Sequence, residues 1–224
     1  MTESRTDEGT GTDDRLRQLE AEYLARQTAL TEVLKVMGGA AFDLESVLQA
    51  IVSSAASLCH AEFGTIYLRE GDVYRVITGV GEGANAVAYE RDHPDRPGRH
   101  SVTGRVLLSG EAVQIEDVLA DAEYDQPVAQ ELSGFRTLIG LPILRDGQIE
   151  GVIDLGRAEV RPFLDTEIAL AATFAEQVAI AIENARLLET IERQRTELAR
   201  FVSPQIAALI SSAEGEQLLA GHRR

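Results

Sequence analysis

The sequence has one cysteine, no tryptophan and few basic residues, and each shortage excludes a class of protein. A single cysteine, Cys59, cannot form an internal disulfide and fits the reducing cytoplasm. Aromatic residues make up 5% of the chain, which is little for stacking nucleic-acid bases. A formal net charge of −16 would repel both nucleic acid and an anionic membrane.

Long apolar runs are also missing. No stretch approaches the ~20 apolar residues of a membrane span, and the first residues are polar and acidic, unlike a signal peptide. We therefore expect a cytoplasmic protein that inserts into no membrane and binds no nucleic acid.

What is present describes a globular chain of 224 residues, with 44% hydrophobic and 26% charged residues. Residues 1–13 have nothing to bury and are expected to be disordered. Apolar residues then recur at helical spacing, which predicts an N-terminal dimerisation helix within residues 14–41, ended by Gly38 and Gly39. A second helix is expected from Asp43, a suitable N-cap, to Cys59.

The pattern next switches to the alternation typical of strands. The turns at Gly71 and at Asp146-Gly147 each predict a hairpin. Residues 81–100 are expected to be loop and residues 117–134 to be mostly loop and short helix, with a further short helix capped by Ser101 between them. The order predicts an α+β fold, with one antiparallel sheet, helices on one face, and loops with short helices on the other. The predicted strands are Phe63–Arg69, Val73–Val80, Ala112–Ile115, Phe135–Leu144 and Gln148–Arg157.

A long helix is predicted from Asp165, its expected cap, to Val202, because this stretch contains neither proline nor glycine. Its second half keeps only one apolar stripe, at alternating steps of four and three residues, as in a coiled-coil seam. A stripe this narrow favours a parallel homodimer over the alternative, a surface helix of a monomer. The seam residues are Ile180, Asn184, Leu187, Ile191, Gln194, Leu198 and Phe201.

Several of these stretches together resemble the GAF domain, a sensory domain. They are Leu44–Ala61, FGTIYLREGD, SVTGRVLLSGEAVQIEDVLAD, LIGLPILRDGQIEGVIDLGR and FLDTEIALAATFAEQVAIAIENARL. The resemblance covers residues 42–188 and implies a six-stranded sheet, although the residue pattern alone gives five strands. It also implies a ligand pocket under the loops 81–99 and 117–134.

The C-terminus resembles the lead-in to a class III adenylate or guanylate cyclase domain. The similar residues are Phe201–Ile206, Gly215 and Leu219–Arg224. This resemblance implies that 189–202 is a coiled-coil output helix and 203–224 a linker to a C-terminal cyclase domain. The chain itself is expected to have no catalytic activity.

Candidate pocket residues come from the two loops and their borders. The polar candidates are Arg105, Asp117, Asp121, Tyr124 and Arg136, and the apolar ones are Val87, Tyr89, Val102 and Phe135. A few polar groups in an apolar cleft are what a small-molecule site requires. The alternative is that the charged residues only tie loops together.

No metal site or cofactor is identified from the sequence. Cys59 and His60 are adjacent rather than at ligand spacing, and His93 and His100 are interpreted as solvated loop residues. Gly156-Arg157 stands where GAF domains that bind cyclic nucleotides have Asn-Lys, which argues against that ligand.

Three functions follow as hypotheses. The first is a sensory module that dimerises and controls a cyclase. The second is a ligand-free scaffold that sets dimer geometry in a cyclase, histidine kinase or similar protein. An enzyme like the methionine sulfoxide reductases built on this fold is disfavoured, because those use cysteines in the pocket loops.

Overall fold

The structure is a computed structural model that describes residues 43–81 and 84–201. The predictions for residues 1–41 and 203–224 lie outside the described residues. The chain divides into two units, residues 1–181 and 182–224, which are described separately.

The first unit is built on a five-stranded antiparallel sheet, in the order β2-β1-β5-β4-β3. The strands match the predicted ones within two residues at each end. Asp146 and Gly147 have φ of +50° and +76°, the left-handed conformation that a two-residue hairpin loop requires. The strands are β1 Phe63–Glu70, β2 Val73–Val80, β3 Val113–Ile115, β4 Thr137–Arg145 and β5 Gln148–Arg157.

The resemblance implied six strands, and five are formed among the described residues. The chain returns to the free edge of β2 only at Asp95, where backbone N–H groups and carbonyls of Asp95 and Tyr74 are bonded at 2.8 Å in both directions. Just before it lies helix α3, Ala84–Asp92, in a segment predicted to be loop. This prediction was wrong: the segment forms a helix although turn-forming residues flank it.

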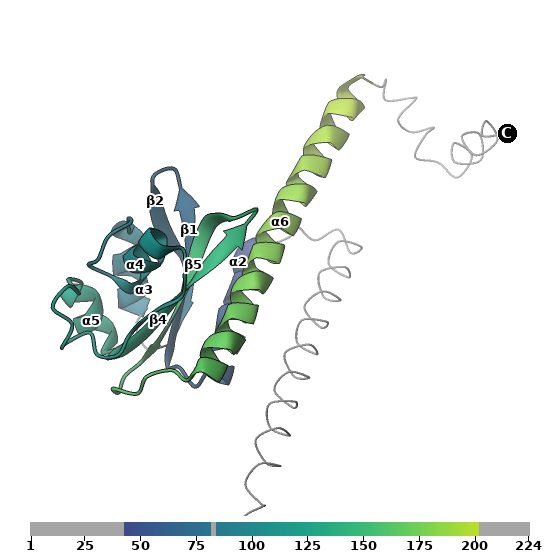
Figure 1. Ribbon diagram of the computed structural model, residues 1–224. Helices are drawn as coiled ribbons and strands as arrows, with labels where there is room; N and C mark the ends of the chain where they lie inside the picture. Colours follow the sequence, from purple (N-terminus) through teal and green to yellow (C-terminus); the bar gives the residue numbers. More distant parts are fainter. Residues whose placement is uncertain (1–42, 82–83, 202–224) are drawn as a thin grey trace, which may run out of the picture. The chain divides into compact units, whose positions relative to one another are not determined.

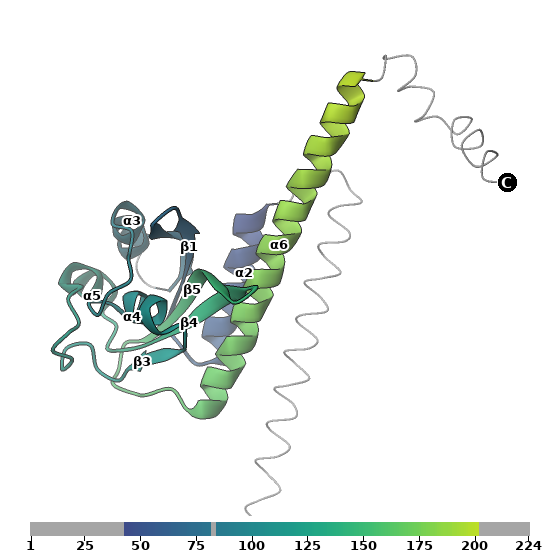
Figure 2. The same cartoon turned by 45° about the horizontal axis from the view of Figure 1, so that its top comes forward.

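Helices cover both faces of the sheet (Figures 1 and 2). Helix α2, Leu44–Leu58, and the beginning of α6, Asp165–Phe201, lie on one face. Helices α3, α4 (Val102–Ser109) and α5 (Pro127–Ser133) lie on the other. The α+β architecture is therefore confirmed, with short helices in what was predicted to be the loop face.

The three predicted N-caps have different outcomes. Ser101 caps α4, since its Oγ accepts the N–H of Gly104 at 2.8 Å. Asp43 makes no such bond and instead accepts the hydroxyl of Ser46. Asp165 is the first residue inside α6, and Glu167 satisfies the helix start by accepting the N–H of Leu164 at 2.9 Å.

One layer of the hydrophobic core lies between the sheet and helices α2 and α6, and a second cluster of buried residues lies on the α4 and α5 side. Leu48, Val52 and Ala55 of α2 are fully buried, and Ala171 and Val178 of α6 are buried with them. Full burial of a Leu or Val side chain contributes about 1.5–3 kcal/mol. This layer fixes the sheet and leaves its other face available for the site.

The second unit begins within α6, and its described part is helical from residue 182 to Phe201. Between Glu189 and Glu197 every side chain is exposed. By length and composition alone, Asp165–Glu197 could cross a membrane, although the sequence analysis predicted no membrane-spanning segment. A helix packed in a protein core passes the same test, and Phe174 and Val178 are buried in the first unit.

Candidate functional site

A cavity of about 80 Å³ lies between the sheet and helices α3, α4 and α5. Five of the residues predicted for the pocket line it: Val87, Tyr89, Val102, Tyr124 and Phe135. Phe135 is central, with Tyr124 and Phe63 packed edge-on against its ring at centroid distances of 6.3 and 6.4 Å. These three rings form an apolar wall of the cavity. That the five residues contact a ligand stays a prediction.

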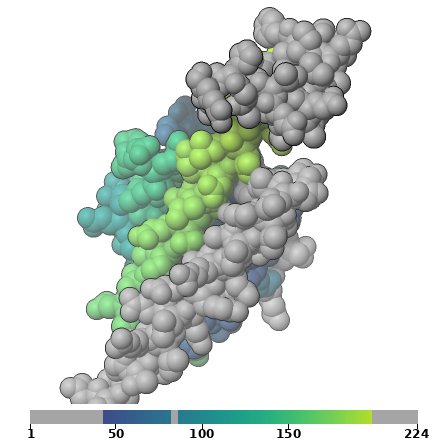
Figure 3. All heavy atoms as spheres, turned by 90° about the vertical axis from the view of Figure 1, so that its right-hand side faces the viewer, coloured from purple at the N-terminus to yellow at the C-terminus, as the bar shows by residue number. Residues whose placement is uncertain are grey.

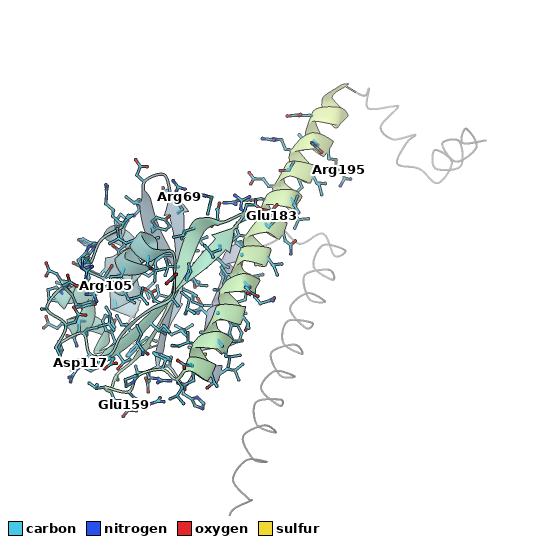
Figure 4. The ribbon with its side chains drawn as sticks, in the orientation of Figure 1. Arg69, Arg105, Asp117, Glu159, Glu183 and Arg195 are labelled. Atoms are coloured by element: carbon cyan, nitrogen blue, oxygen red, sulfur yellow. The ribbon has the colours of Figure 1, made fainter. Side chains whose placement is uncertain are left out.

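The four predicted charged residues do not line the cavity but form two bidentate ion pairs. Arg105 donates to Asp121 at 2.7 and 2.8 Å, and Arg136 donates to Asp117 at 2.9 and 2.7 Å. These hydrogen bonds hold the pKa of both aspartates below the usual range. Figure 4 shows Arg105 and Asp117 on the side of the sheet that carries α3–α5.

This geometry corresponds to the second interpretation of the charged residues, that of loop tethers. Asp121 in addition accepts the backbone N–H groups of Glu123 and Tyr124 at 2.9 and 3.0 Å. The Arg105–Asp121 pair therefore fixes the backbone from which the Tyr124 ring enters the cavity wall. Its effect on the site is indirect.

Three carboxyl groups that the sequence analysis did not select line the cavity: Glu90, Asp95 and Asp154. Asp154, on β5, is buried, and its Oδ2 accepts the hydroxyl of Thr103 at 2.5 Å. Its Oδ1 has no hydrogen-bond partner among the described residues. Burial raises the pKa of Asp154 well above its ordinary value, and the charges of Glu90 and Asp95 raise it further.

Glu90 and Asp95 differ in how many donors they have. Tyr67 donates its hydroxyl to Glu90 at 2.8 Å, and burial nevertheless raises the pKa of Glu90 to about 7. Asp95 accepts the hydroxyl of Ser101 at 2.5 Å and the N–H of Arg96 at 2.6 Å, and lies 2.8 Å from Nε2 of His100. Asp95 is thus well paired, whereas Glu90 and Asp154 each have one side-chain donor.

One of these residues left a signal in the sequence. Asp154 is the only charged residue in the buried run Gly151–Gly156, and a lone carboxyl on a core strand needs an explanation. Glu90 gave no signal, because its helix was predicted to be loop.

The histidines are placed at the edge of the site. The ring of His93 stacks on Tyr89 at 4.0 Å, lines the cavity, and has Nδ1 2.7 Å from the Tyr89 carbonyl oxygen. Within residues 43–81 and 84–201, no three His, Cys, Asp or Glu side chains are grouped to hold a metal ion. Cys59 is buried away from the cavity lining, and burial raises the pKa of its thiol to about 12.

Arg157, which the sequence analysis weighed together with Gly156 as a sign against cyclic nucleotide binding, does not line the cavity. Its guanidinium donates to the carbonyls of Cys59, His60, Arg161 and Pro162 and to the Glu167 carboxylate, at 2.7–3.1 Å. It also stacks over Phe163, 3.7 Å from the ring centroid. Arg157 is a structural residue, and Gly156 alone of this pair lines the cavity.

The fold agrees with a comparison against known families, in which the GAF domain model matches residues 43–182. The chain belongs to the GAF domain family. The matched residues start one position later and end six positions earlier than the expected range of 42–188.

Several solved structures are similar in fold to this GAF domain. One is the GAF domain of a phosphoenolpyruvate-protein phosphotransferase from Coxiella burnetii, with a TM-score of 0.62, 19% identity, and coverage of 77% of this chain and 98% of that one. A free methionine-R-sulfoxide reductase from Neisseria meningitidis has a TM-score of 0.60 and 17% identity, covering 84% and 98%. A domain of a putative two-component sensor histidine kinase protein from Sinorhizobium meliloti has a TM-score of 0.55 and 22% identity, covering 68% and 99%.

Proposed function

We propose that this GAF domain is a sensory module that binds a small molecule in the cavity described above. The observation that carries the proposal is the cavity itself, whose lining combines the aromatic rings of Phe135 and Tyr124 with the carboxyl groups of Glu90 and Asp154. Apolar walls with a few convergent polar groups are the usual make-up of small-molecule sites.

The signal would leave the domain through α6 in a parallel homodimer. Leu187 and Ile191 lie one helical turn apart on α6, with 52% and 58% of their surface exposed. Ile180, in the first unit, is 52% exposed as well, and Figure 3 shows side chains of α6 at the molecular surface. Large apolar side chains at this spacing are buried when two such helices pair.

The other seam residues complete the proposed dimer. Asn184, as a polar residue in the seam, would set the register of the two helices. Gln194 is exposed, and the side chains of Leu198 and Phe201 lie outside the described residues.

The proposed output domain is a class III nucleotide cyclase that follows residue 224 in the full-length protein. The support is the resemblance of Phe201–Ile206 and Leu219–Arg224 to the segment that precedes such domains. The GAF domain would be purely regulatory, and it would act in the cytoplasm.

A second candidate function is a ligand-free scaffold that only sets the geometry of a dimer, for a cyclase, a histidine kinase or a similar protein. The size of the cavity favours it, since about 80 Å³ is small beside the 300–1,000 Å³ typical of ligand pockets. Native mass spectrometry of the purified protein separates the two functions. A ligand mass released on activation supports the sensor, and the bare chain mass under all conditions supports the scaffold.

The dimer is tested by placing like charges in the seam. Leu187→Glu with Ile191→Glu should convert the dimer to monomers, measured by light scattering, and leave the circular dichroism of the GAF domain intact. In the full-length protein the same pair should abolish cyclase activity.

The matched control makes the same change in net charge outside the seam. Arg193→Gln with Thr196→Glu also makes the net charge more negative by two, because one positive charge is removed and one negative charge is added, and this variant should remain a dimer. A monomeric wild type would contradict the dimer itself. A dimer unaffected by the seam charges would place the contact elsewhere. Either result would remove the proposed relay.

A further inference from the structure

The cavity has a marked imbalance of charge. Glu90, Asp95 and Asp154 line it, while none of its lining residues in the described part of the chain is a lysine or arginine. His93 is the one lining residue that can carry a positive charge, and its Nδ1 lies against the Tyr89 carbonyl. A ligand that brings its own positive charge would correct this imbalance.

Asp154 provides an independent indication, because it is a buried carboxyl with an unpartnered oxygen. Only 8% of the residue is exposed, Thr103 satisfies Oδ2, and Oδ1 has no partner in the described chain. The neighbouring strand carries Gly140 opposite Asp154, and a Cβ there would lie 2.9 Å from Oδ1. The glycine thus makes room for a carboxyl that the fold itself leaves half satisfied, at a cost of about 1–3 kcal/mol.

The aromatic side chains beside these carboxyls suit a cation as well. Tyr67, Tyr89 and Tyr124 line the same cavity. The face of an aromatic ring attracts a cation, most strongly where water is excluded. Charge-assisted hydrogen bonds from N–H donors to carboxylates are about twice as strong as neutral ones.

We propose that the ligand of this cavity is a small organic cation with N–H donors, an ammonium or guanidinium compound, held by the carboxylates of Asp154 and Glu90. The proposal rests on the proposed function, since it names the ligand class of the same sensory cavity. Tyr67 orients Glu90, Thr103 orients Asp154, and the tyrosine rings surround the cation. Neutral compounds of the same shape would bind more weakly, and anions would be repelled.

Binding of the cation is coupled to loss of protons. In the empty cavity burial raises the pKa of Asp154 and Glu90, so these carboxyls retain protons at pH values where exposed ones have lost them. A bound cation stabilises the carboxylates, and each proton lost goes to solvent. The affinity should therefore rise as the pH increases from about 5 to 7.

The other titratable groups that face the two carboxyls come from several elements. Tyr67 on β1 and Tyr124 before α5 face them, and Asp95, which follows α3, does so as well. His93, also after α3, lines the same cavity. Burial raises the pKa of both tyrosines further above 10, which keeps them neutral throughout this range. His100 lies against Asp95, with Nε2 2.8 Å from its carboxylate.

The test compares two probes of nearly the same shape, methylguanidinium and N-methylurea. Each is titrated at low millimolar concentration into the whole chain at pH 7.5, with sodium chloride added to equalise ionic strength. Backbone amide shifts in ¹H–¹⁵N spectra report binding. Methylguanidinium should shift resonances of cavity residues and raise the Tm, and N-methylurea should do so at least tenfold more weakly.

Two variants locate the site, and a third is the control. Asp154→Asn and Glu90→Gln each keep the size of the side chain and should weaken methylguanidinium binding at least tenfold. Asp125→Asn removes the same charge from an exposed residue near the cavity and should leave binding unchanged. Calorimetric titration of methylguanidinium in buffers with different ionisation enthalpies should give binding enthalpies that differ between the buffers, as expected for proton release.

Two results would overturn the proposal. Equal binding of both probes would mean that the cavity takes neutral donors, and the sensory function would stand with another ligand class. No cavity shifts with methylguanidinium at any pH from 5 to 8 would also reject the cation, and the proposed function would then rest on the mass-spectrometric test alone.

Discussion

The two faces of β5 treat buried charge in opposite ways. Arg157, on the face covered by α2 and α6, is fully buried and donates to four carbonyls and to Glu167. Asp154, three residues earlier and on the α4 face, has one donor and an unpartnered oxygen. The contrast separates a face on which a buried charge is fully paired from a face on which a buried carboxyl keeps an unpartnered oxygen, and it is on the second face that we propose the ligand binds.

Ionisation follows the same division. Burial alone would raise the pKa of Glu167, but the Leu164 N–H and the Arg157 guanidinium outweigh it and hold that pKa below the ordinary value. Burial of Glu90 is opposed by one tyrosine hydroxyl, and its pKa is raised to about 7. Glu167 therefore stabilises the fold above its ordinary pKa, and its contribution is lost as the pH falls. Glu90 acts in reverse, because the folded chain retains its proton, and stability falls as the pH rises from about 4.5 to 7.

The largest expected effect comes from removing the paired charge. Arg157→Met should lower the free energy of unfolding by about 3–5 kcal/mol, because it leaves Glu167 and several carbonyls buried without their donor. Urea denaturation at pH 7 measures this. Arg99→Met, which breaks the exposed pair with Glu123, should leave the free energy of unfolding nearly unchanged, because solvent screens that pair. A loss as small as this control at Arg157 would mean that water replaces the missing donor.

A smaller effect, of the opposite sign, is expected on the cavity face. The pKa of Asp154 is raised in the folded chain, so wild-type stability falls as the pH rises above about 4. Asparagine does not titrate, and Asp154→Asn should therefore gain stability relative to wild type with rising pH. The gain is at most about 1.4 kcal/mol for each pH unit within the window.

Urea denaturation of both proteins at pH 5, 6.5 and 8 checks this prediction. A constant difference across the three values would show that Asp154 is charged throughout, with a partner that the structure does not contain.

The smallest effect concerns the loop tethers. Arg136→Gln breaks the pair with Asp117 and should lower the free energy of unfolding only slightly, because solvent screens a pair at the surface. It should leave methylguanidinium binding unchanged, because Arg136 does not line the cavity. A tenfold weaker affinity would assign Arg136 to the site, as one interpretation of the sequence had it.

The strands were predictable because their chemistry is local. Alternating residues and the Asp146-Gly147 turn are sufficient to place β4 and β5, and the αL conformation of both turn residues bears this out. Ser101 was likewise found as a cap because an N-cap acts on its own helix. Helix α3 was missed, since weak amphipathicity gave it no signal and tertiary contacts decide its conformation.

The cavity was predictable only in its apolar part. Val102 and Phe135 could be placed because apolar residues beside the loops had to face the sheet. The charged residues were harder, since Arg105 and Asp121 look the same in sequence whether they bind a ligand or each other. Glu90 and Asp154 meet from elements 64 residues apart, and nothing local in the sequence records that approach.

The most direct test of the difference between the two faces is a ¹³C titration of the glutamate carboxyl groups by NMR. Glu90 and Glu167 are followed in the same sample from pH 3 to 9, with Glu90→Gln as the assignment control. We predict a midpoint of about 7 for Glu90 and a midpoint below the ordinary 4.5 for Glu167. Midpoints near 4.5 for both residues would contradict the claim that one face of the sheet pairs its buried charge and the other leaves it for a ligand.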